Sequence, residues 1–171
     1  MMIKLQYENL TIRQAINADA RQLALWWNDG SVMAHAGFPK GLGLTEDQVR
    51  GKIFEGLLII EENCKPIGEC YYKDVGNGTA EIGIKICVAS CQDRGVGRKV
   101  LSLLISFLFQ TGYKKLVLDT NLNNKRAQHV YELLGFYKVR TNINSWTDQL
   151  GVLQSSVEYE LVEDDFISRL N

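Results

Sequence analysis

The fold is decided by the stretch TAEIGIKICVASCQDRGVGRKVLSLLISFLF, residues 79–109. Its first ten residues alternate, with apolar side chains at every second position from Ala80 to Val88 and with Glu81 and Lys85 between them. Such alternation is typical of a strand that has one buried face. A polar loop and two glycines then lead into a run whose apolar residues recur at helical spacing. The stretch therefore predicts a strand, a glycine-rich turn and an amphipathic helix in succession.

A further strand is predicted at Leu116–Thr120, directly after this helix. Two strands that are joined by one crossover helix are normally parallel neighbours in a sheet. The runs Leu57–Glu61 and Ile67–Tyr72 are instead separated by short turns from each other and from the strand Thr79–Val88, which predicts an antiparallel meander. The expected fold class is α/β, with a mixed sheet and helices on both faces.

The rest of the chain supplies shorter elements. Helix boundaries are indicated by the capping-box pattern of Thr45 and Gln48 and by Asn124 and Gly135 at the ends of another helical run. We expect a strand at 10–13, a helix from Asn17 or Asp19 to Trp27, a loop over Ser31–Gly43, a helix from Thr45 to about Gly56, a helix after Asn124, strands at Phe136–Arg140 and Ser156–Val162 around a polar loop at Thr141–Gln154, and a solvated tail from Glu163.

The length of 171 residues and the hydrophobic content of 46% are those of one globular domain. We expect a single domain over residues 1–171, with a core at about 10–162. The 19 Lys and Arg residues against 20 Asp and Glu leave no basic excess, which argues against nucleic acid and membranes as partners. Residues 1–10 lack the apolar run of a signal peptide, and the four cysteines show no C-x-x-C spacing. We therefore expect free thiols, no metal site and a cytoplasmic location.

The turn QDRGVG at residues 92–97 is the clearest candidate for chemistry. Glycines permit close approach of an anion, and the first N–H groups of a helix are unpaired and lie at the positive end of its dipole. A dinucleotide fingerprint would need a third glycine where Val100 stands, and a P-loop would need Gly-Lys-Ser/Thr. The pattern therefore disfavours both nucleotide sites and fits another phosphate-bearing ligand or an ordinary glycine-rich turn.

Two motifs make the sequence resemble the GNAT superfamily of acetyl-CoA-dependent N-acetyltransferases. Residues 92–97 match its Q/R-x-x-G-x-G/A signature, and Asn124 followed by the run AQHVYELLGF at 127–136 resembles its second motif. The segments WWND at 26–29 and AEIGI at 80–84 are similar to the branch of ribosomal-protein N-terminal and polyamine acetyltransferases. The resemblance implies a mostly antiparallel sheet with one parallel, splayed strand pair.

The resemblance also implies how acetyl-CoA is held. Its pyrophosphate is expected at the backbone amides of residues 94–98, with side-chain charge from Arg98 and Lys99. Its pantetheine arm is expected in the splay, pairing with the strand backbone as an added strand would. A backbone N–H of that strand would polarise the thioester carbonyl. The expected acetyl-CoA residues are Ile86, Val88, Gln92, Asp93, Arg94, Gly95, Val96, Gly97, Arg98, Lys99, Asn124 and Ala127.

Two side chains are candidates for the transfer itself. Tyr131 holds the family's position for the acid that protonates the leaving thiolate, although a core aromatic would fit the same helix stripe. An attacking amine is protonated at neutral pH, so a carboxylate must remove a proton directly or through water. Glu81 is the candidate base, since its spacing to Gln92 matches that of the catalytic glutamate in some histone acetyltransferases. A cross-strand ion partner is the alternative reading of Glu81.

The acceptor is less well defined by the sequence. We expect a primary amine, either a protein N-terminus or a small molecule, with Trp26, Trp27 and His35 as candidate contacts. Specificity is expected in the two predicted loops, Ser31–Gly43 and Thr141–Gln154. The alternative from another class is a non-catalytic acetyl-CoA-binding sensor or interaction module, and a nucleotide-binding switch is a third reading. Monomer and homodimer both fit the sequence.

Overall fold

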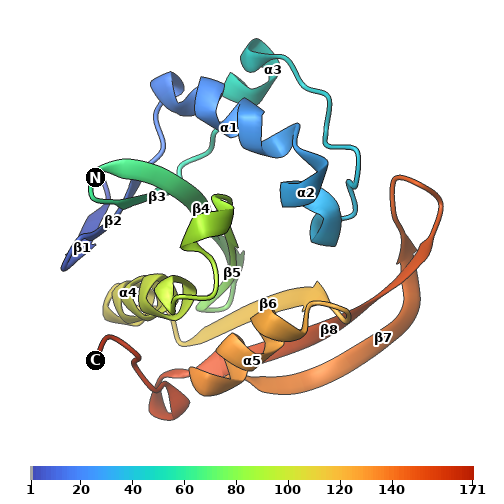
Figure 1. Ribbon diagram of the computed structural model, residues 1–171. Helices are drawn as coiled ribbons and strands as arrows, with labels where there is room; N and C mark the ends of the chain where they lie inside the picture. The colour runs from blue at the N-terminus through green and yellow to red at the C-terminus, as the bar shows by residue number, and fades with distance from the viewer. Residues whose placement is uncertain (1) are drawn as a thin grey trace.

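The computed structural model describes residues 2–171, which form one open sheet of eight strands in the order β1-β2-β3-β4-β5-β6-β8-β7 (Figure 1). The strands are β1 (Lys4–Tyr7), β2 (Leu10–Gln14), β3 (Leu57–Glu62), β4 (Lys65–Gly76), β5 (Thr79–Ile86), β6 (Lys115–Asn121), β7 (Tyr137–Thr147) and β8 (Leu153–Val162). Every neighbouring pair is antiparallel except β5 and β6, which are parallel. The expected mixed sheet is confirmed.

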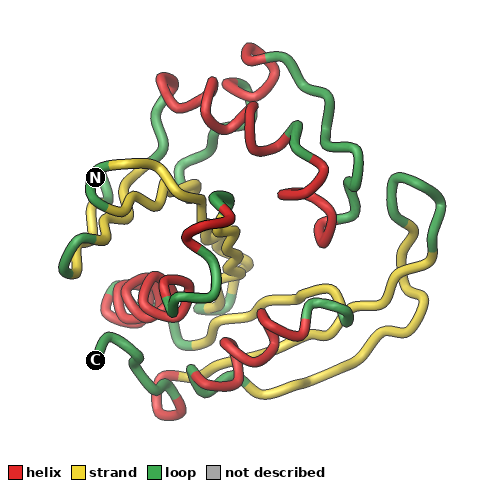
Figure 2. The backbone as a smooth tube through the Cα atoms, viewed as in Figure 1, coloured by secondary structure: helices red, strands yellow, loops and turns green. Residues whose placement is uncertain are grey.

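Helices cover both faces of the sheet, as predicted (Figure 2). The α-helices are α1 (Ala20–Trp27), α2 (Gly30–Met33), α3 (Glu46–Arg50), α4 (Val96–Gln110) and α5 (Lys125–Leu133), and the short 3-10 helices are η1 (Asn17–Asp19), η2 (Ala34–Ala36), η3 (Ala89–Cys91) and η4 (Glu163–Asp165). None of the helices within residues 2–171 has the length and apolar character needed to cross a lipid bilayer.

The two faces of the sheet carry separate hydrophobic cores. On one face α4 and α5 pack their apolar stripes against β5, β6 and β8, with Leu104, Leu108 and Tyr159 fully buried. On the other face α1, α2 and α3 bury a smaller cluster that includes Leu23 and Val49. The alternation of β5 is thereby explained, because its even-numbered residues face the larger core.

The parallel pair β5–β6 separates soon after it forms. Register pairing covers only Thr79–Glu81 against Lys115–Val117. Beyond these residues β5 continues to Ile86 and β6 to Asn121 without pairing to each other, and we call the resulting V-shaped opening the splay. The closed end of the splay lies at Glu81, and its mouth lies where the two strands lead into α4 and α5.

The structure corrects two boundaries on the α1 side. The segment Ser31–Gly43 is not all loop, because it contains most of α2 and the whole of η2. Asp29 starts α2, its Oδ1 accepting the backbone N–H of Ser31 at 2.9 Å. The capping box of Thr45 and Gln48 is confirmed, but the helix that it starts ends at Arg50 rather than at about Gly56.

Larger corrections concern the ends of the chain. Strand β1 has no counterpart among the predicted elements, and the expected loop Thr141–Gln154 is mostly part of the long β7–β8 hairpin. The tail is exposed over much of its length but is anchored rather than simply solvated: the Phe166 ring lies 6.2 Å from that of Phe109, and the Arg169 backbone N–H donates to Ser102 Oγ at 2.9 Å.

Candidate functional site

The N-terminus of α4 provides a row of unpaired backbone amides. Gly95 is the N-cap residue and has the left-handed φ of +78° that the sharp turn requires. The amide N–H groups of residues 94–98 have no acceptor within residues 2–171, as expected for the first turn of a helix. A Cβ atom on Gly97 would meet no atom within 4 Å, so the space beside this turn is open. This geometry fits a phosphate group.

Side chains of the same turn hold it in place from within. Gln92 Nε2 donates to the backbone carbonyl of Ile86 at 2.8 Å, which fixes the turn against the end of β5. Asp93 accepts from the guanidinium of Arg126 at 2.9 Å. Because Arg126 belongs to α5, this ion pair bridges the mouth of the splay. The polar side chains of this turn are therefore bonded to the protein, while its amides remain free.

The basic residues around the turn are neutralised to different extents. Arg94 lies 2.7 Å from Glu62, and Lys99 lies 3.7 Å from Glu8. Arg98 forms no ion pair with any described residue, and its Nε lies 3.0 Å from the position that a Cβ on Gly95 would take. Of the two cations expected to face the pyrophosphate, Arg98 is the one without a carboxylate partner.

The walls of the splay carry the other expected acetyl-CoA residues. Ile86 and Val88 lie on the β5 side, beyond the last residue that pairs with β6, and Ala127 lies on α5; all three are partly buried against the larger core. Asn124 is confirmed as the N-cap of α5, since its Oδ1 accepts the Ala127 N–H at 3.2 Å. Its Nδ2 has no acceptor among the described residues and is free to donate.

Tyr131 combines a buried ring with an unpaired hydroxyl. Its side chain is 6% exposed, and its ring centroid lies 5.8 Å from those of Phe136 and Tyr159. The hydroxyl has no hydrogen-bond partner within residues 2–171. Burial, with a smaller contribution from the charge of Asp119, raises the pKa of Tyr131 to about 12. The hydroxyl oxygen is not among the buried side-chain atoms that lack a partner, so it is accessible and free to contact a ligand although the ring is buried.

Glu81 lies at the closed end of the splay and is held by a residue that the sequence analysis missed. The Tyr71 hydroxyl donates to Glu81 Oε1 at 2.8 Å. The Tyr71 ring occupies the space beside Gly83, where a Cβ atom would stand 2.3 Å from it. The glycine in the AEIGI segment is therefore explained by this ring. Only the pairing of Tyr71 with Gly83 across β4 and β5 could have indicated the contact.

A second carboxylate, Asp119, was also missed. It lies on β6, two residues beyond the last parallel pair, and lines a hollow of about 410 Å³ together with Glu81, Asn142 and Glu158. Partial burial, followed by the negative charge of Glu81, raises the pKa of Asp119. The sequence of β6, KLVLDTN, does not alternate at this position, so the available signal was only a carboxylate within a predicted strand. Within the described residues neither Glu81 nor Asp119 forms an ion pair, so the hollow is negatively charged.

The expected acceptor contacts lie in two different settings. Trp26 and Trp27 are only 6% and 9% exposed and belong to the smaller core, where Trp27 Nε1 donates to Glu69 Oε2 at 3.0 Å. His35 is exposed on η2, and η2 contacts β6. The structure thus brings the histidine segment, rather than the two indoles, to the strand that carries Asp119.

The two segments expected to determine specificity contact each other. Gln149, at the tip of the β7–β8 hairpin, donates its backbone N–H to the Gly37 carbonyl at 2.8 Å and its Nε2 to the Gly41 carbonyl at 2.9 Å, and its Oε1 accepts the Lys40 N–H at 2.8 Å. Trp146 packs so closely on Gly37 that a Cβ there would lie 2.5 Å from the indole. Together the segments form an arch that joins the α2 side to the hairpin.

The described residues contain no side-chain cluster of the kind that binds a metal ion. No group of three or more His, Cys, Asp or Glu side chains within residues 2–171 is arranged to hold a metal ion. The four cysteines are free thiols.

Comparisons with known proteins agree with this geometry. Three solved structures share the fold over almost their whole length. A GNAT-family acetyltransferase from Bacillus anthracis has a TM-score of 0.81 and 15% identity, and the match covers 95% of this chain and 99% of that one. For spermidine N-acetyltransferase from Vibrio cholerae in complex with CoA and spermine, the TM-score is 0.81, the identity is 20%, and the match covers 92% of this chain and 97% of that one; for ribosomal-protein-S5-alanine acetyltransferase from Vibrio fischeri, the TM-score is 0.80, the identity is 15%, and the match covers 96% and 99%. No curated protein sequence matches the chain.

The family assignment comes from the sequence itself. A family model described as the acetyltransferase (GNAT) domain matches residues 9–137, which include β5, the glycine-rich turn, α4 and α5. The resemblance noted in the two motifs therefore extends over most of the chain. The chain belongs to the GNAT family of acetyltransferases.

Proposed function

We propose that this protein transfers an acetyl group from acetyl-CoA to a primary amine, by direct attack of the amine while both substrates are bound. The observation that carries the proposal is the arrangement of groups along the splay. Free amides at the start of α4 lie at its mouth, and Glu81 and the unpaired hydroxyl of Tyr131 lie further in. In this proposal one opening joins a phosphate site to an acid and a base.

The residues at the mouth fit coenzyme A. The amides of residues 94–98 and the free guanidinium of Arg98 would hold its pyrophosphate. Beyond Glu81 the edge of β5 has no strand partner on the β6 side and would pair with its amide-bearing arm. Near the end of β5 the Ile86 carbonyl already accepts Gln92 Nε2 and the Val88 N–H donates to the Ile67 carbonyl, so the remaining backbone groups of this edge would make the pairs. Asn124 Nδ2 would donate to it or to an ordered water. Acetyl-CoA supplies an acetyl thioester at the inner end of this site.

Glu81 is proposed as the base that takes a proton from the attacking amine, directly or through a water molecule. The hydrogen bond from Tyr71 holds one oxygen of the carboxylate, which lines the hollow, and leaves its second oxygen free. Asp119 adds negative charge beside it, which favours entry of a protonated amine. Tyr71 and Asp119 act in this proposal as positioning and electrostatic residues.

Tyr131 is proposed as the acid that protonates the leaving sulfur. With a pKa of about 12, the hydroxyl keeps its proton throughout the neutral range and has a proton to donate when the thiolate forms. The packing of its ring against Phe136 and Tyr159 would hold the hydroxyl in one position. The core-aromatic reading and the acid reading are therefore compatible for this residue.

The acceptor is proposed to be a positively charged primary amine, either a small molecule or a peptide N-terminus, that enters beneath the arch. The negative hollow at Glu81 and Asp119 supports a cation, and His35 on the arch side would contact the acceptor. Trp26 and Trp27 would shape the site from the core behind it. The structurally similar acetyltransferases named for spermidine and for a ribosomal-protein alanine support an amine acceptor.

Two further points belong to the same proposal. Monomer and homodimer both fit it, since all the site residues named above come from one chain. A cytoplasmic location is supported by the four free thiols, which are typical of a reducing compartment.

The test is amine-dependent release of free thiol. Purified protein is incubated with acetyl-CoA and a panel containing spermidine, amino acids and alanine-initiated peptides. We expect at least one amine to release thiol above the amine-free rate, and Glu81→Gln to abolish most of that increase. Glu46→Gln, which removes an exposed carboxylate on α3, is the matched control and should retain it. Binding of coenzyme A with no amine-dependent release would favour the non-catalytic sensor instead.

A further inference from the structure

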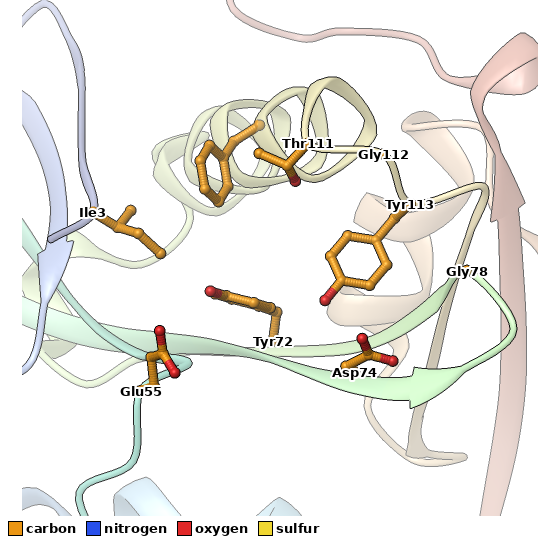
Figure 3. Close-up of a pocket in the computed structure, with 9 residues that line it drawn as sticks. Ile3, Glu55, Tyr72, Asp74, Gly78, Thr111, Gly112 and Tyr113 are labelled. Carbon is orange, nitrogen blue, oxygen red and sulfur yellow. The ribbon is translucent and has the colours of Figure 1, made fainter. Parts of the chain in front are cut away.

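A second pocket lies at the C-terminal end of α4, at the opposite end of the helix from the free amides of residues 94–98 (Figure 3). It has a volume of about 440 Å³ and lies between β4, the end of α4 and the turn that leads to β6. Three aromatic rings, those of Tyr72, Phe107 and Tyr113, line it. None of these residues belongs to the site described above.

The aromatic rings of this pocket form a connected wall. The centroid of the Tyr72 ring lies 6.4 Å from that of Phe107 and 6.5 Å from that of Tyr113, and both contacts are edge-to-face. All three side chains are only half-buried. Their exposed surfaces border the cavity, and the faces of aromatic rings attract cations.

Two carboxylates complete the lining. Figure 3 shows the side chains of Glu55 and Asp74 beside the Tyr72 and Tyr113 rings. Neither carboxylate forms an ion pair with any residue from 2 to 171. The adjacent cation on β4, Lys73, lies over the rings of Phe54 and Tyr71 instead, with its Nζ 5.2 and 5.3 Å from their centroids. Asp74 Oδ1 accepts the Gly76 backbone N–H at 2.8 Å, but neither carboxylate of the pocket has a cationic partner within the described residues.

The end of α4 adds to this negative potential. The helix ends at Gln110, and the next two residues, Thr111 and Gly112, line the pocket. The C-terminal end of a helix carries the negative end of its dipole, which favours a cation. The N-terminus of the same fifteen-residue helix presents the free amides described above. One helix thus has an anion cradle at one end and a cation-attracting pocket at the other.

We propose that this pocket binds a small organic cation of the alkylammonium class, at a site separate from the acetyl-transfer site. An anion would be repelled by both carboxylates, and a neutral apolar ligand would strip them of water without compensation. A calcium ion would require six or more oxygen ligands, whereas only two carboxylates line this pocket. An alkylammonium ion can pack on the ring faces while its positive charge is attracted by the carboxylates.

The probe for this proposal is tetramethylammonium, which has no N–H and cannot be acetylated, so its binding is independent of the proposed transfer reaction. Titration of the full chain is followed by NMR on the ring protons of Tyr72, Phe107 and Tyr113, with sodium chloride at equal ionic strength as the reference. We expect saturable shifts at these rings. The double variant Glu55→Gln/Asp74→Asn keeps the shape of both side chains and should weaken binding by about tenfold or more.

A matched variant separates the two sites. Glu81→Gln/Asp119→Asn removes the same amount of charge from the hollow at the splay and should leave the ring shifts unchanged. The dispersion of the same spectra shows whether either variant has unfolded. Phe107→Leu is a second test, because it removes a ring and leaves the carboxylates in place. We expect it to weaken binding of tetramethylammonium. Absence of saturable ring shifts in the parent protein, or equal weakening by the two double variants, would overturn the proposal.

Discussion

The cradle at the start of α4 can be tested by placing a side chain in it. Gly97 lies in the first turn of the helix, without a positive φ, and a Cβ there would have no atom within 4 Å. Gly97→Val should therefore not strain the fold. Replacing glycine inside a helix generally adds a few tenths of a kcal/mol of helix propensity or more, so the free energy of unfolding should be equal or slightly higher.

The effect on the ligand follows from the same geometry. The added side chain would occupy the open space where a phosphate must approach the amides. Loss of one or two charge-assisted hydrogen bonds, each worth about 1.5–3 kcal/mol, corresponds to a coenzyme A affinity weaker by about ten- to a hundredfold or more. The same substitution at Gly95 is a poorer test, because its φ of +78° and the adjacent Arg98 guanidinium would strain a valine.

Isothermal titration of coenzyme A measures this directly. Gly51→Ala, at the end of α3, is the control: it also adds side-chain atoms at a glycine with ordinary φ, and its Cβ would meet the protein only at van der Waals distance. The control should bind coenzyme A as the parent protein does. Parent-like affinity in a folded Gly97→Val variant would refute the cradle.

Three other substitutions test the inner part of the site. Glu81→Gln should slow turnover by about 10² while coenzyme A affinity is kept, and the rising limb of the pH–rate profile should weaken; parent-like turnover would mean that another group is the base. Tyr131→Phe deletes only an unpaired hydroxyl, so the melting temperature should barely change while single-turnover thiol release slows by about 10²; an unchanged rate would leave Tyr131 as a core aromatic. Asp119 has a raised pKa in the folded protein, so its ionisation opposes folding: Asp119→Asn should increase the free energy of unfolding at pH 7, and the gain should disappear as the pH falls below the unfolded-state value, measured by urea denaturation. If the free energy of unfolding of the variant exceeded that of the parent protein by the same amount at pH 7 and at a pH below the unfolded-state pKa, the raised pKa of Asp119 would be contradicted.

Elements with a strong periodic pattern could be predicted from the sequence. The alternation of β5 and the apolar stripe of α4 arise because each buries one face in the larger core. Since α4 connects β5 to β6 as a crossover helix, the two strands were expected to be parallel neighbours. The glycine-rich turn was predictable because its conformation requires glycine at position 95. Local caps, such as Thr45 with Gln48, were predictable because both partners lie within one turn of helix.

Features that depend on distant partners could not be predicted in the same way. Most residues of β7 are exposed, so this edge strand shows no alternation and was expected to be a loop beyond Arg140. The hydrogen bond from Tyr71 to Glu81 depends on the register of β4 against β5. The approach of Asp119 to Glu81 depends on the position at which β5 and β6 stop pairing. The arch rests on hydrogen bonds between residues more than a hundred positions apart. None of these has a local sequence pattern.

We propose that the splay holds the thioester between Glu81 and Tyr131. It is tested most directly by a crystal structure of the protein with coenzyme A. We expect the pyrophosphate on the amides of residues 94–98, the arm along β5, and the sulfur within hydrogen-bonding distance of the Tyr131 hydroxyl. Coenzyme A bound elsewhere, or in the splay with its sulfur beyond the reach of that hydroxyl, would contradict the account.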